Sequence, residues 1–222
     1  MPIIRLTDVS KRFKEKVLYE DVNLSVDEGA CVGIVGANGS GKSVLFKLIT
    51  GLESADTGTI HVKGNLVGKD LNFPQGVGLF VNQPGYIQSY DWFTTLKLLA
   101  EIQNKVGEET IRSFMLRVHL DPDDKTKVAN YSAGMKQKLG IAQAIMEGQD
   151  IVLLDEPFNA LDYQTNNDVM EILVDLKGQG KTLLMTSHQH GYLEKLCDHL
   201  FLIVDKKLVV FDEELKRKYF LF

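Results

Sequence analysis

The chain has 222 residues, of which 44% are hydrophobic and 25% charged, a composition typical of soluble globular proteins that excludes collagenous, low-complexity and disordered classes. With 25 Lys and Arg against 30 Asp and Glu, the net charge of −5 lacks the basic excess of nucleic-acid-binding proteins, so no nucleic-acid partner is expected. The apolar runs are far shorter than the roughly 20 residues that span a bilayer, and no secretory signal opens the chain, which predicts a cytosolic protein.

Hydrophobic patterning predicts an α/β fold. Two runs of alternating apolar and polar residues, IIRLTDV and VLYEDVNLSV, predict antiparallel strands within the first 26 residues, joined by a charged loop, KRFKEK. The run CVGIVG at 31–36 has no alternation, which is typical of a strand buried on both faces of a parallel sheet. The runs at 151–155 and 182–187 have the same character.

The middle of the chain has helical periodicity and few strand-forming residues. We therefore predict one domain over 1–222, in which 1–83 and 149–222 form the core and 84–148 form an inserted α-helical lobe.

The two cysteines, Cys31 and Cys197, are too far apart in sequence for a metal-site spacing. A reducing compartment would keep both as thiols. We expect them to act as small buried hydrophobic residues.

The segment GANGSGKS at 36–43 follows the first buried strand and precedes the helical run VLFKLIT, which Gly51 would end. Glycines at this spacing allow positive φ and a close approach to phosphate, and Lys42 would reach the β and γ phosphates. The Ser43 hydroxyl would take a position on Mg²⁺. The residues expected to hold the phosphates are Gly36, Asn38, Gly39, Ser40, Gly41, Lys42, Ser43 and Val44.

Two acidic residues end the buried run IVLLDEP. At the carboxyl end of a strand, Asp155 would hold Mg²⁺, and Glu156 would polarise a water that attacks a phosphoanhydride. Taken alone, the two acids would instead suggest solvated loop residues or helix caps, and the upstream phosphate loop favours the catalytic interpretation.

The segment YSAGMKQKL at 131–139 opens a helix with Ser132 as its N-cap. The unpaired N–H groups at such an end attract anions, so this is a second candidate phosphate site. The alternative is an ordinary capped helix.

The ordered set GANGSGKS, YSAGMKQKL, IVLLDEP, NALD at 159–162 and TSH at 186–188 resembles the nucleotide-binding subunit of ATP-binding cassette (ABC) transporters. The resemblance covers essentially the whole chain. It implies a P-loop NTPase fold with a mixed central sheet, an N-terminal antiparallel β part and an inserted helical lobe. It also implies ATP and Mg²⁺ as ligands.

The same resemblance implies a head-to-tail dimer, in which Ser132 and Gly134 contact the γ-phosphate held by the partner cassette. Asp162 would link the two sites, and His188 would sense the γ-phosphate and the attacking water. Phe13 stands where the family stacks an aromatic ring on adenine, although an apolar anchor for the first sheet is an equal alternative.

The sequence departs from the family pattern at several positions. Tyr131, Ala133 and Met135 replace the Leu, second Gly and Gln of the usual Leu-Ser-Gly-Gly-Gln. In VNQPG, Asn82 takes the usual position of a Mg²⁺-coupled glutamine, and Gln83 falls one residue later. Both stay candidates.

The resemblance implies a partner that is an integral membrane permease, and therefore a place at the inner face of the membrane. It is strongest to cassettes of drug or antimicrobial-peptide exporters. Aromatic residues after the VNQPG segment would contact the permease or form the lobe's core: Tyr86, Tyr90, Trp92 and Phe93. Two alternatives are a cassette that regulates a soluble or nucleic-acid machine and a slowly hydrolysing nucleotide switch.

Overall fold

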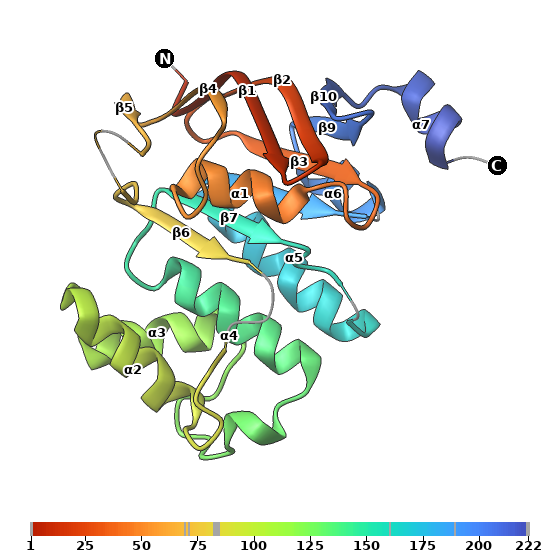
Figure 1. The fold of residues 1–222 in the computed structure, drawn as a ribbon. Coiled ribbons are helices and arrows are strands. Elements are labelled where there is room, and N and C mark those ends of the chain that lie inside the picture. The colour runs from red at the N-terminus through yellow and green to blue at the C-terminus, as the bar shows by residue number, and fades with distance from the viewer. Residues whose placement is uncertain are drawn as a thin grey trace.

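Two β-sheets and the helices packed between and around them make up the fold (Figure 1). The computed structural model describes residues 2–68, 70, 72–81, 85–159, 161–188 and 190–220. The strands are β1 (Ile4–Phe13), β2 (Lys16–Val26), β3 (Cys31–Gly36), β4 (Thr57–Val62), β5 (Asn65–Leu66), β6 (Val77–Phe80), β7 (Ile151–Asp155), β8 (Thr182–Ser187), β9 (His199–Val204) and β10 (Lys207–Val210). The α-helices are α1 (Lys42–Thr50), α2 (Trp92–Gln103), α3 (Glu108–Arg117), α4 (Ala133–Ile145), α5 (Tyr163–Gly178), α6 (His190–Leu196) and α7 (Glu213–Phe220), with a 3₁₀ turn η1 at Val128–Asn130.

The larger sheet has the strand order β10-β9-β3-β8-β7-β6, and only β10 runs antiparallel to its neighbour. Its central strands are buried on both faces, as the unbroken apolar runs predict. In β7, Ile151 and Leu153 face α1 and the antiparallel sheet, whereas Val152 and Leu154 face the cluster formed with α4, α5 and α6. The mixed α/β architecture predicted from the sequence is confirmed.

The smaller sheet is antiparallel, in the order β2-β1-β4-β5, and it covers α1. The prediction that KRFKEK forms a loop is wrong over most of its length, because β1 continues to Phe13 and β2 begins at Lys16. Lys11 explains how a charged segment joins a strand. Its buried ammonium is bound by the Glu53 carboxylate at 2.7 Å and the Ser54 carbonyl at 2.7 Å, which compensates for desolvation.

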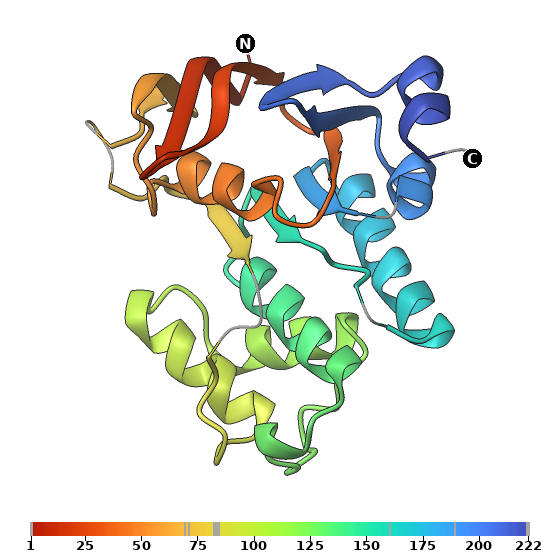
Figure 2. The ribbon, with the colours of Figure 1, turned by 45° about the vertical axis from the view of Figure 1, so that its right-hand side comes forward.

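Helices α2, α3 and α4 gather on the side of the molecule away from the antiparallel sheet (Figures 1 and 2). Trp92 and Phe93 are buried among them, and the Trp92 ring packs on Tyr131 at 4.7 Å between centroids. Of the two roles considered for the aromatic residues, Trp92 and Phe93 therefore take the one in the hydrophobic core formed by these helices. The boundaries of the helical lobe at 84 and 148 stay a prediction.

None of the described helices combines the length and the apolar character that crossing a bilayer requires.

Helix α4 packs directly against β6 through a glycine. A Cβ at Gly78 would lie 1.7 Å from the carbonyl oxygen of Ala144, so the two backbones must separate to admit any side chain. We expect Gly78→Ala to lower the free energy of unfolding by about 2 kcal/mol or more, measured by urea denaturation. Gly178→Ala, where a Cβ meets nothing within 4 Å, is the matched control and should change stability far less.

Candidate functional site

The segment between β3 and α1 forms a loop that wraps around the Lys42 side chain. Gly39 and Gly41 have φ of 77° and 109°, a region that side-chain-bearing residues rarely adopt. Lys42 is buried, and its ammonium donates to the carbonyl oxygens of Gly36 at 2.8 Å and Ala37 at 3.3 Å. The Tyr19 hydroxyl donates to the Gly41 carbonyl, and burial raises the pKa of Tyr19, so that it stays a neutral donor.

Gly36 serves the loop in a different way from the one predicted. Its φ is not positive, unlike those of Gly39 and Gly41. A Cβ at Gly36 would lie 2.6 Å from the Ser40 hydroxyl and 3.4 Å from Cβ of Ile203. Close packing, and not a left-handed backbone, therefore requires glycine at this position.

Asp155 ends β7 beside the first turn of α1. Its side chain is buried, and its Oδ2 accepts from the Ser43 hydroxyl. Its Oδ1 accepts from the Thr186 hydroxyl of β8 at 2.6 Å. Hydrogen bonds from two hydroxyl groups thus compensate for the cost of removing the carboxylate from water.

Glu156 follows Asp155 with φ of 52°, so its backbone lies in the left-handed region. Its Oε1 is 3.0 Å from the Lys42 ammonium, and its Oε2 is 2.9 Å from Nδ1 of His188. Its N–H donates to the Thr186 hydroxyl at 2.9 Å, and its carbonyl accepts from the Gln137 amide at 3.2 Å. The carboxylate is therefore held between a cation and an imidazole, on a backbone fixed from two other elements.

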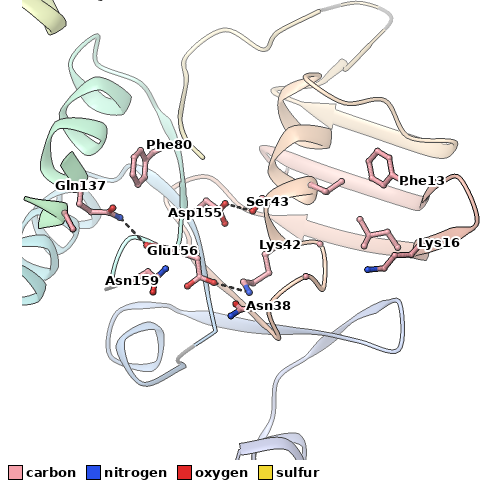
Figure 3. Close-up of a pocket in the computed structure, with 15 residues that line it drawn as sticks. Phe13, Lys16, Asn38, Lys42, Ser43, Phe80, Gln137, Asp155, Glu156 and Asn159 are labelled. Carbon is pink, nitrogen blue, oxygen red and sulfur yellow. Dashed lines mark hydrogen bonds and ion pairs between the residues drawn. The ribbon is translucent and has the colours of Figure 1, made fainter. Parts of the chain in front are cut away.

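These groups face a cleft of about 520 Å³. Figure 3 shows Lys42 and Glu156 pointing toward one another and Asp155 pointing toward Ser43, with Phe13 and Lys16 on the side of the antiparallel sheet and Gln137 on α4 opposite. Phe13 is 43% exposed there, and the Lys11 ammonium lies over its ring, 4.8 Å from the centroid. The lining residues are Phe13, Lys16, Leu18, Asn38, Gly39, Gly41, Lys42, Ser43, Val44, Phe80, Ala133, Gln137, Asp155, Glu156 and Asn159.

Six of the predicted residues lie outside this lining: Gly36, Ser40 and His188, which are described above, and Ser132, Gly134 and Asp162. Ser132 caps α4 by accepting the N–H of Met135 at 3.1 Å, and Gly134 packs so closely on Thr165 that a Cβ would come within 2.7 Å of it. Asp162 caps α5, and the N–H of Thr165 lowers the pKa of its carboxyl, which keeps it ionised. Ser132, Gly134 and Asp162 all stand at helix N-termini. The other two candidates, Asn82 and Gln83, lie outside the described residues.

Several residues at the site were missed by sequence reasoning. Gln137 lies one helical turn after Ala133, and this i, i+4 spacing could have placed both on the face of α4 that borders the cleft. Thr186 belongs to the TSH segment, of which only the histidine had been given a role. Asn159 opens the NALD segment, of which only Asp162 had been given a role, and Lys16 had no signal in the sequence, because only the fold brings it to the cleft.

The oxygen donors of Ser43 and Asp155 suit a hard divalent cation, since Mg²⁺ prefers carboxylate, hydroxyl and phosphate oxygens. Among the described residues, no three His, Cys, Asp or Glu side chains are placed to hold a metal ion by themselves. A cation at this point would need further oxygen ligands from a phosphate-bearing molecule or water.

Comparison with known proteins identifies related chains. The family model described as ABC transporter matches residues 19–159. The uncharacterised ABC transporter ATP-binding protein YybJ of Bacillus subtilis (strain 168) is 37% identical over 196 residues, covering 88% of this chain and 90% of its own length. The lantibiotic transport ATP-binding protein SrtF of Streptococcus pyogenes is 29% identical over 209 residues, covering 94% and 90%.

Solved structures share the fold. A dimeric ATP-binding cassette, described as a post-hydrolysis state bound to ADP and Pi, matches with a TM-score of 0.81 at 21% identity. The match covers 92% of this chain and 96% of that one. At this level of identity, the likeness establishes the architecture.

Thr186 connects the two acidic residues, and its removal tests the network. We expect Thr186→Val to lower the free energy of unfolding by about 3 kcal/mol, because Oδ1 of Asp155 and the N–H of Glu156 each lose a partner. Thr186→Ser keeps the hydroxyl and should recover most of that loss in the same urea titration. A Thr186→Val variant as stable as the wild-type chain would show that the hydroxyl does not support the two acidic residues.

Proposed function

The chain belongs to the ABC transporter family, and on that premise we propose that it binds and hydrolyses Mg·ATP as a dimer and drives a separate membrane permease. The observation that carries the proposal is the meeting of Lys42, Ser43, Asp155 and Glu156 in one cleft beside the glycine-rich loop. A chance match to a phosphate-loop pattern would not bring two carboxylates from another strand to the lysine and serine of that loop.

Lys42 and the loop supply the positive potential for the phosphates. The N–H groups at the start of α1 and the Lys42 ammonium would hold the β and γ phosphates, and they would stabilise the charge that develops on the transferred phosphoryl group. A phosphate oxygen near Lys42 would compete with the Glu156 carboxylate for the ammonium, which lies 3.0 Å from that carboxylate. Phosphate binding would thereby free Glu156 to accept a proton from water.

Glu156 is proposed as the general base. Its carboxylate is partly exposed to the cleft and could accept a proton from the water that attacks the γ-phosphate. His188 holds Oε2 through its ring nitrogen and its backbone N–H, at 2.9 and 3.3 Å. This fixes the direction of the carboxylate and leaves Oε1 for the water once Lys42 turns to phosphate.

Ser43 and Asp155 are proposed to hold Mg²⁺ together with phosphate oxygens, with Asn82 or Gln83 as a further ligand. When bound, the ion would neutralise charge on the β and γ phosphates. On the other side of the cleft, Phe13 is proposed to stack on the base of the nucleotide.

The dimer is proposed to be a homodimer with two nucleotides at its interface. Ser132 and Gly134 lie at the capped N-terminus of α4, which carries partial positive charge and would face the γ-phosphate held by the partner cassette. Asp162, ionised and exposed at the start of α5, would link the two sites.

A permease partner follows from the family, and it would place the cassette at the inner face of the membrane. The likeness to a lantibiotic transport ATP-binding protein supports the finer proposal of an exporter, with antimicrobial peptides or drugs as the substrate class.

Replacing Glu156 by Gln should trap the ATP-bound dimer, because the groups that bind phosphate remain while the base is lost. We expect ATP hydrolysis to fall by on the order of a hundredfold or more, and a dimer to accumulate with Mg·ATP in size-exclusion chromatography. Glu53→Gln, which alters a carboxylate paired with Lys11, is the matched control. A strictly monomeric Glu156→Gln protein at saturating Mg·ATP would contradict the shared-site arrangement.

Replacing Lys42 by Ala should weaken nucleotide binding itself, since the ammonium is the cation nearest the predicted β and γ phosphate positions. Isothermal titration calorimetry with ATP should show at least a tenfold rise in Kd, about 1.4 kcal/mol. Lys63→Ala removes a lysine paired with Asp150 and should leave the affinity unchanged. An unaltered Kd for Lys42→Ala would rule out the assigned contact.

A further inference from the structure

The two cysteines of the chain, 166 positions apart in sequence, meet in the fold. Cys31 is the first residue of β3, and Cys197 follows the last residue of α6. Both are free thiols, and their Sγ atoms are 3.6 Å apart. The expectation of two unrelated buried cysteines therefore missed a dithiol pair.

The backbone around the pair is fixed by hydrogen bonds. The N–H of Cys31 donates to Oδ2 of Asp198 at 2.9 Å, and the N–H of Asp198 donates to the carbonyl of Cys31 at 2.8 Å. The N–H of Cys197 donates to the Leu193 carbonyl at 2.8 Å. A disulfide has an S–S length of about 2.05 Å, so small side-chain rotations would join the two sulfurs while the backbone stays in place.

Gly33 and Lys177 shape the surroundings of the pair. A Cβ at Gly33 would lie 3.1 Å from Sγ of Cys197, so the glycine in β3 leaves the room that this sulfur occupies. The Lys177 ammonium binds the Leu196 carbonyl at 2.8 Å and Oδ1 of Asp198 at 2.6 Å. The thiol contact with Cys31 and burial raise the pKa of Cys197, which the charge of Lys177 partly opposes.

Access to the two sulfurs differs. Cys31 is fully buried, whereas Cys197 is partly exposed. An oxidant from solvent therefore meets Cys197 first, and Cys31 lies behind it at contact distance. A sulfenic acid formed at Cys197 would therefore have a second thiol within reach to resolve it.

We propose that Cys31 and Cys197 form a reversible dithiol–disulfide site that a hydroperoxide oxidises. The Cys197 thiol gives up its proton as its sulfur attacks a peroxide oxygen, the O–O bond breaks, and the released oxygen takes that proton and leaves as an alcohol or water, while Cys197 becomes a sulfenic acid. The Cys31 thiol then attacks the Cys197 sulfur, the S–S bond forms, the S–O bond breaks, and the hydroxide takes the Cys31 proton and leaves as water. The two thiols lose two electrons to the peroxide, and an added dithiol reverses the reaction.

The bond would tie the start of β3 to the end of α6. β3 leads into the phosphate loop, and α6 lies shortly after His188. Because the sulfurs already touch, the bond would constrain the unfolded chain far more than the folded one, and it closes a loop of 166 positions. Oxidation is therefore expected to stabilise the cassette without reshaping the cleft.

The test is peptide mapping of the purified full chain after treatment with hydrogen peroxide. We expect a cross-linked peptide that joins residues 31 and 197. Neither cysteine should then react with a thiol reagent in denaturant, and Tm should rise by an amount that dithiothreitol reverses. Cys31→Ser lacks the resolving thiol, so Cys197 should instead stay as a sulfenic acid that dimedone captures.

Three results would overturn the proposed site. The two thiols could persist after oxidation, Cys197 could be converted to sulfinic acid in the wild-type chain, or a disulfide could form between two chains in place of the internal one. If Cys31→Ser fails to fold, Cys31→Ala serves the same purpose, and the wild-type peptide map decides by itself. ATP turnover does not enter the test, so its outcome is independent of the proposed transport function.

Discussion

The alignment of β3, β7 and β8 places the reactive groups of this protein. Thr186 of β8 is in register with Ile34 of β3 on one side and with Asp155 of β7 on the other. Because the three strands are parallel, their carboxyl ends meet at one edge, where Gly36 opens the phosphate loop and Glu156 follows β7. A register shift of one residue would turn Asp155 to the opposite face and away from Ser43. The burial of these strands on both faces thus fixes the chemistry at their ends.

Burying ionised groups at this edge is tolerated because each has partners. Lys42 meets two carbonyl oxygens and Glu156, and Asp155 meets two hydroxyls. An unpaired buried charge would be far more costly than a lost hydrogen bond between neutral groups. The residues proposed to bind nucleotide are therefore also the residues that satisfy one another in the folded chain, so stability and function share the same contacts.

The sequence predicted what depends on local pattern. Unbroken apolar runs gave β3, β7 and β8, and Gly51 ends α1 with φ of 77°. Contacts between distant segments had no local signal: the burial of Lys11 inside β1, the packing that requires Gly36, and the meeting of Cys31 with Cys197. The roles of Ser132, Gly134, Asp162 and His188 came from family resemblance, and they stay predictions.

The backbone of Glu156 links the cleft to helix α4. A non-glycine residue in the left-handed region costs about 1–2 kcal/mol, so it persists only where surrounding contacts hold it. Here the holding contacts come from Thr186 of β8, which lies in the sheet, and from Gln137 of α4, whose N-terminus is the proposed contact with the partner's nucleotide. A movement of α4 relative to the sheet must stretch or release the bond to the Glu156 carbonyl, and the carboxylate follows its backbone. The position of the proposed base in one cleft is thereby tied to the helix that would close on the other.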